Sequence, residues 1–196
     1  MDKSFKNKFA LHTACGIPGG QITRSADYNE LVSVAQKSAE QPGYGGQVLI
    51  LLAGTNDWAN PAVTEELFQE TYKRLVDQLL SIQHTAVILT GLVPRLSASC
   101  FPGKRYDMRI PTKIVRLLAK EYQDNGRPVR FVPLHNLVLE PGSADGPHDG
   151  ARAVMDGQLK DGIHLAESAV EKVAAQLLFI ISKMPHSWFP TDYEEY

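Results

Sequence analysis

Strand-like and helix-like segments alternate along this chain. The apolar runs at 47–53 (QVLILLA) and 85–94 (TAVILTGLVP) lack polar alternation, which is typical of strands buried on both faces of a sheet. Between them, residues 65–81 carry apolar side chains at helical spacing. A connecting helix of this length allows consecutive strands to run parallel. The pattern predicts an α/β chain whose mostly parallel sheet is covered by helices on both faces.

The alternation continues on both sides of this unit. Further strands are predicted at 8–14 (KFALHTA) and 127–135, and further helices at 28–40, 111–126 and 165–184. Asp27 is a candidate N-cap, and Thr64 with Glu66 marks the helix predicted at 65–81. We expect a four-stranded core with 8–14 beside 47–53. Residues 1–184 would form a single domain, and the aromatic and acidic residues 185–196 a C-terminal tail.

The charge balance restricts the classes of partner. The 196 residues include 20 Lys and Arg against 22 Asp and Glu, so the formal net charge is −2. A chain without a strong positive charge is a poor binder of polyanions, and nucleic acid is a disfavoured partner. Nucleic-acid binding is not excluded, because Lys104, Arg105 and Arg109 form one small basic group.

The cysteines and the apolar runs indicate which kinds of protein this chain can be. Cys15 and Cys100 are too few and too far apart for a disulfide framework or a metal-ligand pattern. We therefore predict no metal and no cofactor. No run approaches twenty apolar residues, and the N-terminus shows no signal peptide. We expect an intracellular protein without a membrane span.

Polar loops follow the predicted strands. GTND (54–57) ends one strand, GIPGG (16–20) follows another, and GLVPR (91–95) follows a third. The carboxyl ends of parallel strands share one edge of the sheet, where ligands bind. We therefore expect these loops to converge.

A possible acid–base pair precedes the last predicted helix. Asp161 and His164 are three residues apart in DGIHL, a spacing at which a carboxylate can orient an imidazole that acts as a base. The alternative is that Asp161 caps the helix and His164 is a surface residue. Asp145 and His148 have the same spacing with no helix after them.

In this order, GIPGGQI, GTND and DGIHL resemble the second, third and fifth blocks of the SGNH (GDSL-type) hydrolases. The resemblance implies a three-layer α/β/α, flavodoxin-like fold and hydrolysis of a small acyl ester. It also implies that Asp161 and His164 are the acid and base of a triad. Asn56 would donate its side-chain amide, and Gly19 its backbone N–H, to the oxyanion. Asp57 is expected to hold its loop in place.

One family block is missing. No Gly-Asp-Ser occurs in the sequence, and Ser4 has no apolar strand before it. The nucleophile could lie outside this sequence, or Cys15, at the end of 8–14, could replace it. A buried structural cysteine is the commoner role for such a residue. The third alternative is an inactive domain of a larger, for example retroelement-encoded, protein that binds a ligand, RNA or another protein.

Overall fold

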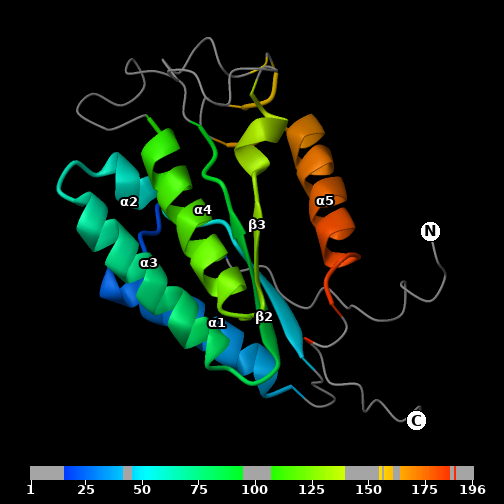
Figure 1. The fold of residues 1–196 in the computed structure, drawn as a ribbon. Helices are drawn as coiled ribbons and strands as arrows, with labels where there is room; N and C mark the ends of the chain where they lie inside the picture. The colour runs from blue at the N-terminus through cyan, green and yellow to red at the C-terminus, as the bar shows by residue number, and fades with distance from the viewer. Residues whose placement is uncertain are drawn as a thin grey trace.

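The computed structural model describes residues 16–41, 46–94, 107–139, 155, 157–160, 164–185 and 188. The described elements alternate between helix and strand, as the sequence predicts (Figure 1). In chain order they are α1 (Ser25–Ala39), β1 (Gln47–Leu51), α2 (Thr55–Ala59), α3 (Glu65–Leu80), β2 (Thr85–Thr90), α4 (Arg109–Asp124), β3 (Val129–Val132), the 3-10 helix η2 (Leu134–Leu137) and α5 (Glu167–Ile181).

The described strands form a three-stranded sheet in the order β1-β2-β3. Both pairs are parallel, with Gln47 opposite Thr85 and Thr90 opposite Val132. The predicted parallel sheet is therefore confirmed for these strands. The fourth predicted strand, 8–14, lies outside the described residues.

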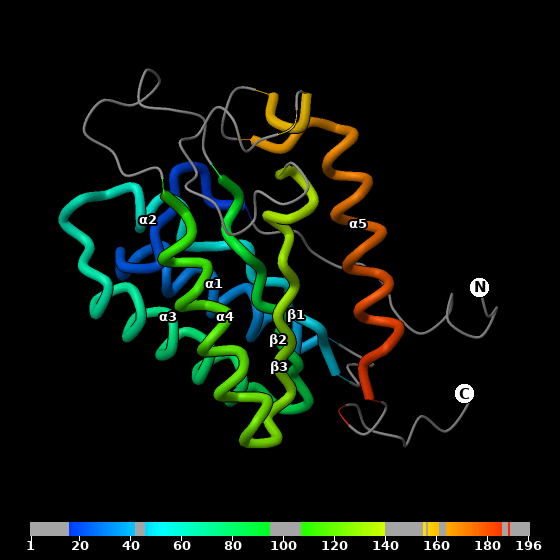
Figure 2. The backbone as a smooth tube through the Cα atoms, turned by 45° about the horizontal axis from the view of Figure 1, so that its top comes forward, coloured from blue at the N-terminus to red at the C-terminus, as the bar shows by residue number. Residues whose placement is uncertain are grey.

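Helices cover the two faces of this sheet unequally. Leu49, Val87 and Phe131 lie in the larger apolar cluster, together with side chains of α1, α3 and α4. Val48 and Ile88 lie in a second cluster with side chains of α5, because successive residues of a strand point to opposite faces. Figure 2 shows α3 and α4 on one side of the strands and α5 on the other. The predicted three-layer α/β/α fold is confirmed.

The limits of α3 and α4 follow from their end residues. The Thr64 side chain accepts a hydrogen bond from the backbone N–H of Leu67, so Thr64 is the N-cap of α3. Helix α4 begins at Arg109, with Pro111 in its first turn, and ends before Gly126, which has a φ of 69°. A glycine in this left-handed region commonly terminates a helix.

The prediction for the start of α1 was wrong. Asp27 is not the N-cap: the helix begins at Ser25, and Asp27 lies in its first turn. The Asp27 carboxylate accepts hydrogen bonds from the Gln21 backbone N–H at 2.8 Å and from the Arg24 guanidinium at 3.2 Å. The carboxylate therefore ties the preceding loop to the helix and leaves the cap position to Arg24.

Strand β1 is less covered than predicted. Ile50 is 42% exposed and Leu52, just after the strand, is 51% exposed, whereas every residue of β2 is buried. Among the described residues, β1 pairs on one side only. The prediction of a strand buried on both faces is confirmed for β2 and wrong for β1 within this part of the chain.

Two short elements were not predicted. Helix α2 begins inside GTND, and η2 follows β3.

One residue of the predicted tail, Trp188, has a defined contact. The guanidinium carbon of Arg130 lies 4.3 Å from the centroid of the Trp188 ring. Trp188 also packs at the margin of the second apolar cluster.

Candidate active site

The GTND sequence converts the end of β1 into a sharp turn and a short helix. Gly54 has a φ of 100° and is the N-cap of α2. A Cβ at this position would lie 2.9 Å from the Cε2 atom of Phe68, and a side chain at this φ would itself be strained. Glycine is therefore needed for both backbone and packing reasons, and the helix that it begins carries Asn56 and Asp57.

Asp57 is fully buried and joins α2 to the GIPGGQI segment. Its Oδ2 accepts a hydrogen bond from the Ile22 backbone N–H at 3.0 Å. Its Oδ1 accepts from the backbone N–H of Thr23 at 2.8 Å and from the Thr23 hydroxyl at 2.7 Å. These charge-assisted bonds give Asp57 the expected role of holding the loop.

The buried Tyr72 ring lies behind this carboxylate. Burial, and then the charge of Asp57, raise the pKa of the Tyr72 phenol well above its ordinary value. Its hydroxyl makes no hydrogen bond to the described residues. Tyr72 therefore stays neutral near the Asp57 carboxylate.

The GIPGG segment forms a tight turn. The Gly20 N–H donates to the Ile17 carbonyl oxygen at 2.9 Å, with Pro18 and Gly19 at the central positions. Gly19 has a φ of 67°. Proline followed by a positive-φ glycine is the signature of a type II turn. The turn exposes Gly19, whose backbone N–H makes no hydrogen bond within the described part of the chain.

The structure brings the two predicted oxyanion donors to the same place. The Asn56 side-chain amide donates to the Gly20 carbonyl oxygen at 3.2 Å, one residue from Gly19. Segments that are 36 residues apart in the chain therefore meet at the carboxyl end of β1. A side-chain amide beside an exposed backbone N–H suits the stabilisation of a developing negative oxygen.

His164 lies in a turn just before α5. Its carbonyl oxygen accepts from the Lys160 backbone N–H at 2.8 Å, and Leu165 forms a bridge with Leu159. Figure 1 shows this segment and α2 at the same end of the sheet. The predicted partner Asp161 and the candidate thiol of Cys15 lie outside the described residues.

The end of β2 lies against a histidine that the sequence reasoning did not select. A Cβ at Gly91 would lie 2.1 Å from the Nδ1 atom of His135. His135 belongs to η2, which follows β3 and is therefore at the same carboxyl edge. The available signal was its position as the last residue of the predicted strand 127–135, because polar residues at such ends gather where ligands bind.

The far side of α2 is fixed to the start of α4. The Trp58 indole N–H donates to the Asp107 carbonyl oxygen at 2.8 Å. Asp107 also pairs with Arg109 through two hydrogen bonds to its Oδ1 and Oδ2, 2.9 and 3.1 Å from Nε. Hydrogen bonding to Asp107 raises the pKa of Arg109. In the basic group of Lys104, Arg105 and Arg109, the charge of Arg109 is therefore balanced by Asp107. Lys104 and Arg105 lie outside the described residues.

Neither a metal cluster nor a membrane span is found in the part of the chain that the structure describes. No group of three or more His, Cys, Asp and Glu side chains there could hold a metal ion. No helix there is long and apolar enough to cross a membrane.

The comparisons with known proteins agree with this architecture. Residues 11–177 match the family model of the GDSL-like lipase/acylhydrolases. No curated protein matches the sequence significantly. A protein of Bacteroides fragilis, proposed to be an acylhydrolase, superposes with a TM-score of 0.60 at 19% identity, covering 84% of this chain and 71% of that chain.

Two further solved structures are similar in fold. A GDSL-like lipase of Bacteroides thetaiotaomicron gives a TM-score of 0.57 at 18% identity. The aligned region covers 84% of this chain and 72% of the lipase chain. A lipase/acylhydrolase of Enterococcus faecalis gives 0.57 at 17% identity, covering 85% and 73%. At these identities the similarity establishes the fold, and the activity has to be argued from the residues.

Proposed function

Because this chain belongs to the GDSL-like lipase/acylhydrolase family, we propose that it hydrolyses a small carboxylic ester at the carboxyl edge of its sheet. The observation that carries the proposal is the Asn56–Gly20 hydrogen bond. It holds a side-chain amide next to the exposed turn of Gly19. Both groups are neutral donors, which stabilise an oxyanion without taking part in proton transfer.

In the proposed reaction, a nucleophile adds to the ester carbonyl carbon while His164 takes its proton. The carbonyl oxygen becomes negative and is stabilised by the Asn56 amide and the Gly19 N–H. The carbon–oxygen bond to the alcohol then breaks, and His164 returns the proton to the leaving oxygen. Water hydrolyses the acyl intermediate in the reverse sequence. Asp161 orients His164 and stabilises its cationic form.

The nucleophile is the open role in this proposal, because the sequence contains no Gly-Asp-Ser. Cys15 directly precedes the GIPGG segment. A thiolate paired with a histidine base is an effective nucleophile for acyl transfer. We take Cys15 as the first residue to test.

The missing block also supports a second candidate function. A domain that retains the Asn56–Gly20 contact but has no nucleophile would bind an ester, an RNA or a protein partner without turning over a substrate. The net charge of −2 favours a neutral ligand over RNA.

Turnover of short-chain p-nitrophenyl esters separates these candidates. We expect His164→Asn to abolish turnover, and Asn56→Ala to lower kcat by about 10²- to 10³-fold. His84→Asn is the matched control, because His84 is exposed, lies directly before β2 and has a φ of 54°, which asparagine tolerates. Melting temperatures verify that each variant is folded.

Each outcome decides between the alternatives. Turnover that survives Cys15→Ala would remove the thiol from the mechanism. A folded wild-type chain without turnover would favour the binding domain. Equal activity of the His164→Asn and His84→Asn variants would contradict the proposed base.

A further inference from the structure

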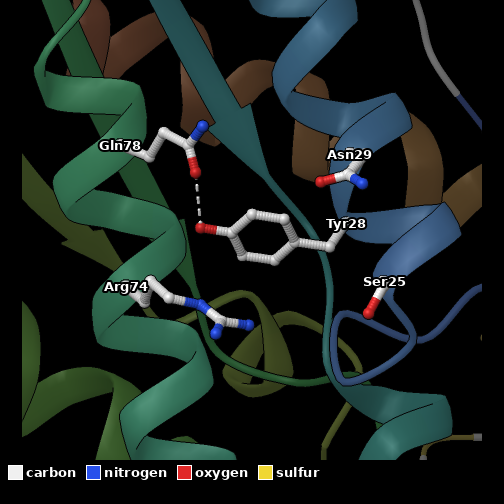
Figure 3. Close-up of a pocket in the computed structure, with 5 residues that line it drawn as sticks. All are labelled: Ser25, Tyr28, Asn29, Arg74 and Gln78. Carbon is white, nitrogen blue, oxygen red and sulfur yellow. Dashed lines mark hydrogen bonds between the residues drawn. The ribbon is translucent and has the colours of Figure 1, made fainter.

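A surface groove lies between α1 and α3, outside the candidate active site. It is lined by Ser25, Tyr28 and Asn29 from α1 and by Arg74 and Gln78 from α3 (Figure 3), and its volume is about 300 Å³. This volume is at the lower end of the range for sites that bind small molecules. None of the lining residues belongs to the proposed hydrolase site.

The buried Tyr28 ring organises the groove. Its hydroxyl donates to the Gln78 Oε1 at 2.8 Å, so the Gln78 carbonyl oxygen is occupied and its amide N–H₂ remains as a donor. The Arg74 guanidinium carbon lies 4.8 Å from the centroid of the same ring. Stacking on an aromatic ring restricts a long side chain and places its charge before a ligand arrives.

The groove contains more hydrogen-bond donors than acceptors. Arg74 makes no ion pair within the described residues, although its guanidinium can donate five N–H groups. The nearby carboxylates of Asp27 and Asp77 lie outside the lining and accept bonds from Gln21 and Tyr122 respectively. Because no ion pair within the described residues neutralises it, the Arg74 guanidinium favours a negatively charged ligand.

The start of α1 adds to the positive potential. Ser25 is the first residue of this 15-residue helix, and the N-cap Arg24 makes no side-chain capping bond. The N-terminus of a helix carries a partial positive charge. Its contribution reinforces that of Arg74, which faces Tyr28 from the opposite helix.

We propose that this groove is a binding site for a small oxyanion, a carboxylate or a phosphate group. Arg74 binds two of its oxygens, and Gln78, Asn29 and Ser25 donate further hydrogen bonds. The planar guanidinium matches the geometry of both groups. The proposal does not depend on the hydrolase activity.

Titration of the full chain at constant ionic strength, followed by the NMR shifts of backbone amides, tests the site. Sodium phosphate and sodium acetate are the two probes, and their relative affinities distinguish phosphate from carboxylate. We expect saturable shifts at residues 25–29 and 74–78. Arg74→Gln should weaken binding about tenfold or more, as expected for the loss of a charge-assisted bidentate contact.

Two further variants complete the test. Arg116→Gln removes an exposed charge on α4, which does not line the groove, and should leave binding unchanged. Tyr28→Phe keeps the ring beneath Arg74 but frees Gln78, and should weaken binding less than Arg74→Gln. The absence of localised shifts up to about 50 mM of both anions, or equal losses in Arg74→Gln and Arg116→Gln, would overturn the proposal.

Discussion

Asp57 and Thr23 are joined by two hydrogen bonds to one carboxylate oxygen, from the Thr23 backbone N–H at 2.8 Å and from its hydroxyl at 2.7 Å. The second oxygen of Asp57 accepts from Ile22. One buried side chain therefore determines where the GIPGGQI segment lies relative to α2. The geometry of the Asn56–Gly20 contact depends on it.

Asp57→Asn should strongly destabilise the chain. An asparagine presents an N–H₂ group to one of the backbone N–H donors, and a buried donor is left without an acceptor. We expect a loss of about 3 kcal/mol in the free energy of unfolding, measured by urea denaturation. Asp124→Asn is the control, because it breaks only the exposed pair with Lys120 and should cost less than about 0.5 kcal/mol. Similar losses in both variants would contradict the anchoring role of Asp57.

Gly54→Ala should destabilise the chain more than Gly126→Ala. Both glycines have positive φ values, 100° and 69°. A new Cβ at Gly54 would meet the Phe68 ring at 2.9 Å, whereas a new Cβ at Gly126 would have no atom within 4 Å apart from its chain neighbours. We expect about 1 kcal/mol for Gly126→Ala from backbone strain alone, and about 2–3 kcal/mol for Gly54→Ala. Equal urea midpoints for the two variants would show that the ring moves aside freely.

Tyr72→Phe should leave the chain as stable as before, or stabilise it by up to about 1 kcal/mol, because it removes a buried hydroxyl without a described partner. Tyr122→Phe should be destabilising, since the Tyr122 hydroxyl donates to Asp77 at 2.6 Å. Urea denaturation of both variants provides the comparison. A large loss in Tyr72→Phe would reveal a hydrogen bond to the hydroxyl.

The same tyrosines should make the chain sensitive to alkali. The pKa values of Tyr72 and Tyr122 are raised above the ordinary 10.0, chiefly by burial. Above about pH 10 the unfolded chain releases these protons while the folded chain retains them, so stability falls as the pH rises. Urea midpoints between about pH 9 and about pH 11 should fall less steeply in Tyr72→Phe. An unchanged slope would exclude Tyr72 as a source of this dependence.

The side of β1 away from β2, which pairs with no other described strand, should accept a further parallel strand. Helix α1 lies on the same sheet face as α3 and α4. A right-handed connection through α1 into β1 must therefore start on the side of β1 opposite to β2. The GIPGG turn is held at the carboxyl end of β1 by Asn56. We expect the preceding segment, 8–14, to provide this strand, as its apolar pattern predicts.

Hydrogen exchange of the β1 amides tests this expectation. Leu11→Pro removes a backbone donor and should accelerate exchange in β1 but not in β2, which is paired on both sides. Lys3→Pro, outside the predicted strand, is the control. Slow exchange in β1 that both variants leave unchanged would contradict the pairing.

The sequence predicted the elements that have a regular apolar pattern or a local signal at their ends. The apolar runs located β1, β2 and β3, and Thr64 located the start of α3. The start of α1 was misplaced because Asp27 bonds to Gln21, a contact across a loop that no local pattern specifies. Likewise, α2 was predicted as loop, because its formation depends on Gly54 packing against Phe68.

Part of the candidate site was also accessible from sequence. The positions of GIPGG and GTND after predicted parallel strands indicated a shared edge, and the Asn56–Gly20 bond joins them there. His135 was missed because its contact with Gly91 is a packing relationship between the ends of neighbouring strands. Spacing along the chain contains no information about such a contact.

The unequal cover of the sheet has a consequence for local unfolding. Trp58 of α2 packs with side chains of α1, α3 and α4, whereas His164 leads into α5, which together with η2 lies on the opposite face. Regions with fewer buried contacts open at lower free energy. The proposed base would therefore separate from the proposed oxyanion donors before the domain unfolds, and the proposed activity would be lost on heating below the global melting temperature.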